Sequence, residues 1–249
     1  MAIIKRFSIG IQPLVRMFRV ASLSGVLADS VLAARDSGRL GDDLYYESVG
    51  VSLPLTMRND KLGHVLAVSA DNVVVTWDYF KSGKSFDFNK VLTEFRAVWS
   101  AVNAVLKMRD LRRVGIVTEH RFVPESGHPS KELMSTLTKL DRWDPEGYKD
   151  RFRLRWESRA IAQDGTIPNR EKADFINQIA EIYDSAVDTD NPQDGAFNVN
   201  LDIQRYYAPA VNNDVVDEVL KLYNKTYVSA SDKLLRALDN LGVTRGPSV

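Results

Sequence analysis

Two segments in the second half of the chain alternate polar and apolar side chains with the two-residue period of a β-strand. Residues 196–206 have a polar face made of Asn198, Asn200, Asp202 and Gln204. Residues 151–161 have a charged face made of Arg151, Arg153, Arg155, Glu157 and Arg159. Strands of this kind belong to an antiparallel sheet that packs on a core through one face only.

Composition narrows the class of protein. The 249 residues are 44% hydrophobic, so the chain can bury a substantial core, and we expect one globular domain over residues 1–249. Lys and Arg together number 33, as do Asp and Glu, so any binding to nucleic acid must come from a local patch. The chain has no cysteine, which excludes disulfides, thiolate nucleophiles and cysteine-ligated metals.

The first residues are not typical of a targeting segment. Lys5, Arg6, Arg16 and Arg19 interrupt the apolar runs, so the core of a signal peptide is missing. No window approaches the run of about 18 apolar residues that a membrane-spanning helix needs. We therefore expect a cytoplasmic protein that does not bind membranes.

The remaining patterns predict strands and helices in a repeated order. In the first half these are a strand at residues 14–20, a helix at 22–36, strands at 45–53, 65–68 and 73–80, a long helix at 88–108 and a strand at 113–123. The second half repeats the plan with a short helix at 130–140, the two alternating strands, a helix capped by Asn213 and a last helix at 231–241. This order predicts an α+β fold: a curved antiparallel sheet in two similar halves, with long helices packed on one face. The halves would be pseudo-repeats over residues 1–125 and 126–249.

Residues 173–187 fit two structures. Phe175, Ile179 and Tyr183 are among the apolar side chains that recur at helical spacing. The segment nevertheless lies between two predicted strands, so we favour a strand here.

Motifs in both halves resemble those of a known family. Residues 112–122, RRVGIVTEHRF, follow a helix that contains tryptophan, and the chain ends with FNVNLDIQRYY and a helical run. This pattern resembles a sporadically distributed, functionally uncharacterised family of bacterial proteins of similar length. The family's strand Arg-Ile-Gly-Leu-Arg-Tyr is matched by Arg113, Val114, Gly115 and Ile116 and departs at Val117 and Thr118; its C-terminal motif is matched by Asp202, Asn224 and Tyr227.

The resemblance implies a common fold over most of the chain and implies no activity. The family's N-terminal motif is Pro-Leu-Val followed by an acidic residue. Residues 13–15 match it, but Arg16 stands where the family has the acid. The patchy distribution of the family would suit a gene associated with bacterial defence.

No motif predicts a catalytic or metal site. SGKS at residues 82–85 follows a strand and precedes a helix, as a phosphate-binding loop does, but Asp78 stands where such a loop has its first glycine and would repel phosphate. His64, His120 and His128 lack the spacing that would place two imidazoles on one metal ion. We expect no cofactor, no metal ion and no catalytic residue, unless the fold brings His120 or Asp78 beside another titratable group.

The arginine-rich strand is the candidate binding surface. Its guanidinium groups suit phosphate or carboxylate, and polar side chains of the other alternating strand could complete the site. The candidate residues are Arg151, Arg153, Arg155, Arg159, Asn198, Asn200 and Gln204. The alternative is a solvated face whose arginines pair with Glu119, Glu181 or Asp202 on neighbouring strands.

Two functions follow from these alternatives. We expect a non-enzymatic interaction or assembly protein that forms a homo-oligomer or docks a protein partner through its sheet face or its C-terminal helices. The alternative is a protein that binds nucleic acid or an anionic ligand through the arginine-rich strand. The second function predicts steep salt dependence, which the first does not.

Overall fold

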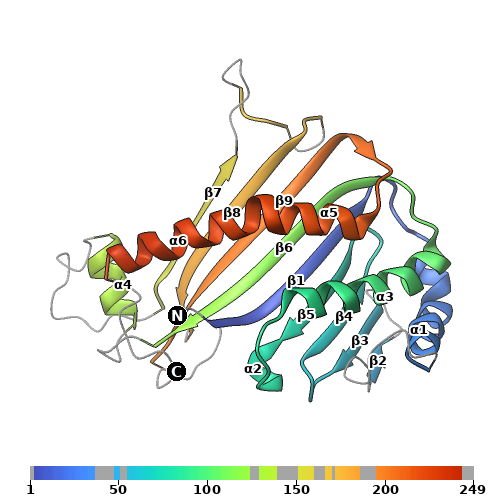
Figure 1. Ribbon diagram of the computed structural model, residues 1–249, viewed down its shortest axis with the longest axis horizontal. Helices are drawn as coiled ribbons and strands as arrows, with labels where there is room; N and C mark the ends of the chain where they lie inside the picture. The colour runs from blue at the N-terminus through green and yellow to red at the C-terminus, as the bar shows by residue number, and fades with distance from the viewer. Residues whose placement is uncertain are drawn as a thin grey trace.

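The protein is a single antiparallel sheet with helices on one face (Figure 1). The computed structural model describes residues 3–36, 48–50, 55–123, 129–138, 151–159, 166–169, 172–185 and 195–242. Within these residues the sheet has nine strands in the order β2-β3-β4-β5-β1-β6-β9-β8-β7. The predicted α+β class is confirmed.

The elements follow one another along the chain in a simple order. They are β1 (Ile3–Pro13), α1 (Val20–Asp36), β2 (Ser48–Gly50), β3 (Leu55–Asn59), β4 (His64–Val68), β5 (Val73–Asp78), α2 (Tyr79–Ser82), α3 (Phe88–Leu106), β6 (Leu111–Phe122), α4 (Pro129–Leu137), β7 (Arg153–Arg159), β8 (Phe175–Asp184), β9 (Phe197–Val211), α5 (Val215–Leu222), the π-helix η4 (Tyr223–Tyr227) and α6 (Val228–Asn240).

The two halves of the sheet have similar connectivity, with one more strand in the first half than in the second. In the first half, β1 is followed by α1 and by the meander β2 to β5, whose last strand returns to pair with β1. In the second half, β6 is followed by α4 and by the meander β7 to β9, whose last strand returns to pair with β6. A long helix follows each meander, and β1 and β6 meet in the middle of the sheet.

Alternate residues of the central strands form the core beneath the helices. Ile9 of β1 lies opposite Val75 of β5 and Ile116 of β6, and all three are fully buried. Figure 1 shows α3, α5 and α6 crossing this face, and α1 packs against α3. The other residues of each strand therefore point to the opposite face of the sheet.

The first strand differs from the prediction. The strand predicted at residues 14–20 is wrong, because β1 lies upstream and the chain turns into α1 from Leu14 onward. The backbone N–H of Leu14 donates to the carbonyl oxygen of Asp110 at 2.8 Å, and that of Met17 donates to Ala70 at 2.7 Å. These bonds fix the turn between strands that are distant in sequence, so local patterns did not reveal it.

The second half differs at its C-terminal helices. Asp214, not Asn213, caps α5, because its carboxylate accepts hydrogen bonds from the N–H groups of Val216 and Asp217 at 2.8 and 3.1 Å. The helix then continues through η4 into α6 without a break, so the last helix begins well before residue 231. The ambiguous segment 173–187 is the strand β8, as favoured.

A polar sheet face as the candidate binding site

Six of the seven predicted binding residues lie on one face of the sheet, opposite α3, α5 and α6. The register aligns Arg155 of β7 with Glu181 of β8 and then with Asn200 of β9. It aligns Arg159 in the same way with Asn177 and Gln204. We define the polar face by these rows and their neighbours: Arg113, Glu119, Arg153, Arg155, Glu157, Arg159, Asn177, Glu181, Asn198, Asn200, Asp202, Gln204 and Tyr206.

Arg151 does not belong to this face. β7 begins at Arg153, and Arg151 precedes it with a backbone φ of 57°, in the left-handed region. The alternation in the sequence therefore extends beyond the strand. The alternating pattern alone could not show where β7 begins, because residues in a turn can match the pattern by chance.

The arginines of β7 lie beside acids and over aromatic rings. Arg153 Nε is 3.4 Å from Glu181 Oε1, and its guanidinium is 4.9 Å from the centre of the Tyr183 ring. Arg159 donates two hydrogen bonds to Glu157 Oε1, at 2.9 and 2.8 Å. The pairing with Glu181 is the cross-strand contact that the sequence offered as the alternative to an anion site.

A hydrogen-bonded network crosses the middle of the polar face. Arg113 donates to the hydroxyl of Tyr206 at 3.4 Å, and this hydroxyl donates to Gln204 Oε1 at 2.9 Å. Gln204 Nε2 donates to Asp202 Oδ2 at 2.6 Å, and Asn177 Nδ2 donates to Gln204 Oε1 at 3.4 Å. Asn177 and Gln204 are buried, so the network fixes these amides in one arrangement.

Asp202 is the most perturbed group of this network. Burial raises its pKa, while the hydrogen bond from Gln204 and the positive charges of Arg113 and Arg155 lower it in part. Its second carboxylate oxygen, Oδ1, has no hydrogen-bond partner within the described chain. The same holds for the side-chain oxygens of Asn177, Asn198 and Asn200. These four oxygens are buried, so the polar face holds acceptors within the sheet and does not present them to a ligand.

The loop with the SGKS sequence does not have the structure of a phosphate-binding loop. Gly83 ends the short helix α2 with a φ of 66°, and Asp78 caps the start of that helix. The first N–H groups of α3, which would hold a phosphate, instead donate to the carboxylate of Asp87. The polar strand-to-helix turn is therefore the better interpretation.

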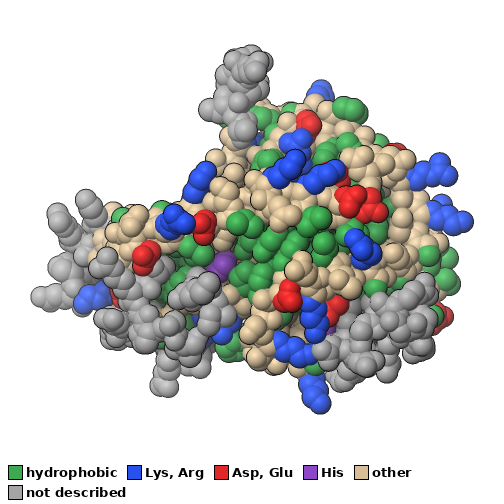
Figure 2. Space-filling model, in the orientation of Figure 1, with side chains coloured by type: hydrophobic (Ala, Val, Ile, Leu, Met, Phe, Trp, Pro, Cys, Tyr) green, Lys and Arg blue, Asp and Glu red, His purple; other side chains and the backbone are tan. Residues whose placement is uncertain are grey.

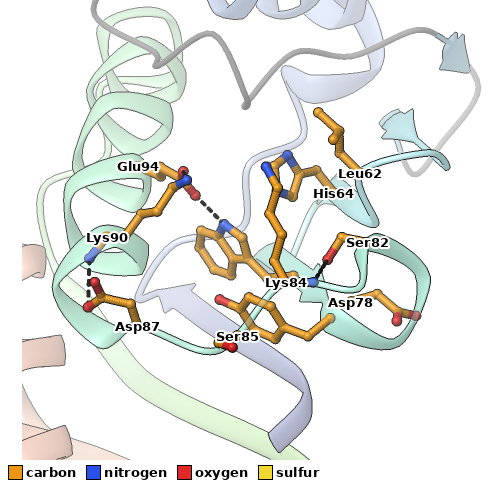
Figure 3. Close-up of a pocket in the computed structure, with 11 residues that line it drawn as sticks. Leu62, His64, Asp78, Ser82, Lys84, Ser85, Asp87, Lys90 and Glu94 are labelled. Atoms are coloured by element: carbon orange, nitrogen blue, oxygen red, sulfur yellow. Dashed lines mark hydrogen bonds and ion pairs between the residues drawn. The ribbon is translucent and has the colours of Figure 1, made fainter.

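A small pocket lies beside this loop, under the N-terminal half of α3 (Figure 3). Its volume is about 40 Å³, which is room for about one water molecule. Glu94 reaches into it from α3 and accepts a hydrogen bond from Trp77 Nε1 at 2.6 Å. Asp78 also lines the pocket, beside Lys84 and Glu94, but its carboxylate is 3.3 Å from Arg6. The pocket is too small for a substrate.

His120 lies in the core and not in a pocket with other titratable groups. It is 3% exposed, and its Nε2 is 3.5 Å from the hydroxyl of Thr118. Thr118 in turn accepts a hydrogen bond from Tyr227 at 3.2 Å. Burial lowers the pKa of His120 to about 4. This is a neutral, structural histidine at neutral pH.

The strand β7 is the last strand of the sheet. Across the described ranges no strand pairs with its outer edge, so its outward N–H and C=O groups face away from the sheet. Its side chains are mostly exposed, and Trp156, on the face opposite the arginines, is 40% exposed. An exposed edge is a template for pairing with another strand.

Comparisons with known proteins add no function. No family model and no curated protein matches the chain. The family resemblance stated above therefore stays a prediction. Over the described residues, no helix is long and apolar enough to span a membrane, and no three His, Asp or Glu side chains gather as a metal site would require.

Several members of the polar face could not be recognised from the sequence. Asn177 was not found because its strand, β8, also fits a helix by spacing, so no face could be assigned to it. Arg113 joins the network because β6 pairs with β9, and no local pattern predicts that pairing. Tyr206 is 6% exposed and packs within the protein, although it belongs to the polar face.

Proposed function

We propose that this protein is a non-enzymatic assembly module, in which two copies associate through the outer edges of their β7 strands. The pairing would be antiparallel and would join the two sheets into one continuous sheet, as in strand addition. A two-fold axis would relate the copies, so each contact would occur twice. The outer edge of β7, with which no strand of the described residues pairs, is the observation that carries this proposal.

The sequence of β7 is complementary to itself. When two copies are aligned antiparallel at Trp156, each Arg155 lies opposite Glu157 of the second copy and the two Trp156 side chains lie opposite each other. Opposite charges and aromatic pairs on facing strands each contribute about 0.2–1 kcal/mol. Arg and Trp are also the residue types that dominate the energy of protein interfaces.

One pair in this alignment opposes the association. Arg153 lies opposite Arg159 of the second copy, which would repel if both charges were free. Each is already beside an acid of its own chain, Arg153 beside Glu181 and Arg159 beside Glu157. These internal pairs reduce the repulsion, so the Arg155 and Glu157 contacts decide the alignment.

The same internal pairs disfavour the alternative function, binding of nucleic acid through the arginines. A phosphate-binding face needs cations that can exchange their counterions for phosphates. On the polar face, Arg153 and Arg159 are beside acids, and Arg113 donates to Asn72 at 3.0 Å as well as to Tyr206. Arg113, Arg153 and Arg159 are therefore already engaged by side chains of their own chain.

Light scattering coupled to size-exclusion chromatography tests the proposal. We expect the wild-type chain to elute at twice its 28.0 kDa mass at both low and high salt, without copurified nucleic acid. Trp156→Ala should shift the equilibrium to the monomer, because it removes the central aromatic pair. Phe80→Ala, a matched change at an aromatic that is 61% exposed but far from β7, should leave the mass unchanged.

Two results would contradict the proposal. A wild-type monomer at all concentrations would exclude self-association. A monomer that carries nucleic acid removable by salt would favour the alternative function, with the arginines of β7 as the binding groups.

A further inference from the structure

A second surface lies at the end of the sheet where β1 leads into α1 and α3 leads into β6 (Figure 1). These two connections form a cleft of about 400 Å³, within the size range of ligand pockets in proteins. Its lining is made of Pro13, Val15, Arg16, Met17, Phe18, Arg19, Leu106, Lys107, Met108, Arg109 and Asp110.

Large apolar side chains line this cleft and are exposed to solvent. Val15 is 73% exposed and Phe18 is 71% exposed, and Leu14 beside them is 51% exposed. Met17 and Leu106 are buried below. Exposed apolar side chains that gather in a hollow are typical of an interaction site, whereas scattered ones need no explanation.

The cleft is also basic. Arg16, Arg19, Lys107 and Arg109 line it, and Asp110 is the only acid among the lining residues. Arg16 is 2.8 Å from Asp71, outside the cleft. Considering only the residues that the structure describes, no acid lies within ion-pair distance of Arg19, Lys107 or Arg109. Figure 2 shows basic side chains at this end of the molecule.

We propose that this cleft binds a short peptide segment of a partner protein that carries apolar side chains next to acidic ones. The apolar side chains would enter the hollow and contact Phe18, while the acids would lie against Arg19 and Arg109 at its rim. Charge complementarity selects the acidic partner, because a basic segment would meet like charges. This surface is separate from the edge of β7, so the cleft can be occupied in a monomer or in a dimer.

A peptide fits this surface better than an anionic membrane does. A helix that docks on lipid buries one continuous apolar face in the plane of the interface. Here the apolar side chains surround a hollow between two connections of the chain. The backbone bonds of Leu14 to Asp110 and of Met17 to Ala70 hold the walls of this hollow in place.

Fluorescence anisotropy with labelled synthetic peptides tests the proposal on the full chain. Three peptide sets of equal length are compared, one of mixed Glu, Leu and Phe, one of mixed Lys, Leu and Phe, and one of mixed Glu and Ser. We expect binding by the first set only. Arg109→Glu and Phe18→Asp should each weaken that binding by about tenfold or more, since each removes a contact that the ligand needs. Arg96→Glu, an exposed change on α3 outside the cleft, should leave it unchanged.

Each other outcome overturns the proposal. Failure of the acidic apolar set to bind, or equal binding by the basic set, would exclude the acidic peptide. Binding that survives both Arg109→Glu and Phe18→Asp would place the site elsewhere. Cosedimentation with vesicles of anionic phospholipid, lost in Phe18→Asp, together with no peptide binding would assign the cleft to a membrane surface.

Discussion

At the scale of single residues, buried polar groups define what this protein can and cannot do. His120 could serve as a base only beside a substrate, but it is buried with Thr118 and Tyr227 and its pKa is lowered to about 4. Glu94 is held by the indole of Trp77 in a space for about one water molecule. Within the described residues, both groups are therefore enclosed by the fold, and neither lies beside a space that could hold a substrate.

The buried His120 predicts a loss of stability in mild acid. In the unfolded chain His120 takes up a proton near pH 6.5, whereas in the folded chain its pKa is about 4. The contribution of neutral His120 to the free energy of unfolding is therefore fully present above pH 6.5 and is lost as the pH drops toward 4. Between pH 7 and pH 5 the loss should be about 2 kcal/mol. Urea unfolding of the wild type and of His120→Gln at both pH values measures it.

The comparison between these two proteins separates His120 from the other titrating groups. Carboxylates titrate in both proteins, so their contribution cancels in the difference. We expect the free energy of unfolding of His120→Gln to fall by about 2 kcal/mol less than that of the wild type. An equal fall in both proteins would show that His120 does not cause the acid sensitivity.

At the scale of elements, the strongly periodic segments were predictable and the turns were not. β9 and α3 each bury one face, so their sequences alternate or repeat as their structures require. The strands β4 and β5 were also predicted, but the turn between them is closed by the hydroxyl of Ser69, which accepts from Asn72 N–H at 3.0 Å. Several side chains can close such a turn, so sequence alone did not specify which one does.

The candidate surfaces depend on elements that are distant in sequence. The polar face needs the register of β6, β7, β8 and β9, and the cleft needs two connections that lie about 90 residues apart, residues 13–19 and 106–110. The exposed Phe18 and the nearby arginines are visible in the sequence. Their position beside Lys107 and Arg109 follows only from the pairing of β1 with β6.

The turn between β3 and β4 predicts a position where only glycine fits. Gly63 has a φ of 70°, and a Cβ on it would overlap the carbonyl oxygen of Asp78 and lie 2.9 Å from the Asp78 Cβ. Gly63→Ala should therefore lower the free energy of unfolding by about 2 kcal/mol or more. Thermal unfolding measures this change.

Gly25 provides the matched control for that substitution. It lies inside α1, and a Cβ there would meet nothing within 4 Å. Gly25→Ala should raise the free energy of unfolding by about 0.5–1 kcal/mol, because alanine loses less backbone entropy in a helix. Equal effects of the two substitutions would contradict the close approach of Gly63 to Asp78.

At the scale of the whole molecule, the structure has two surfaces with different chemistry. The outer edge of β7 carries charges of both signs and an exposed tryptophan, which suits a second copy of the same strand. The cleft beside α1 carries apolar side chains with a basic rim, which suits an acidic partner. An assembly of two copies would therefore present two such clefts and could bind a partner with two acidic segments more tightly than one copy could.

The measurement that tests self-association most directly uses two charge variants, Arg155→Glu and Glu157→Arg. In the proposed alignment residue 155 lies opposite residue 157 of the second copy, so each variant alone would place like charges opposite each other twice. In a mixture, one Arg155→Glu chain and one Glu157→Arg chain would restore both opposite-charge contacts. Sedimentation velocity on each variant and on the mixture measures this.

We expect each variant alone to sediment as a monomer and the mixture to sediment at twice the chain mass of 28.0 kDa. The costs that each substitution has inside its own chain are the same in the separate and mixed samples, so they cannot produce the difference. A mixture that remains monomeric while the wild type forms a dimer would contradict the antiparallel pairing of β7 and would place the contact between copies on another surface.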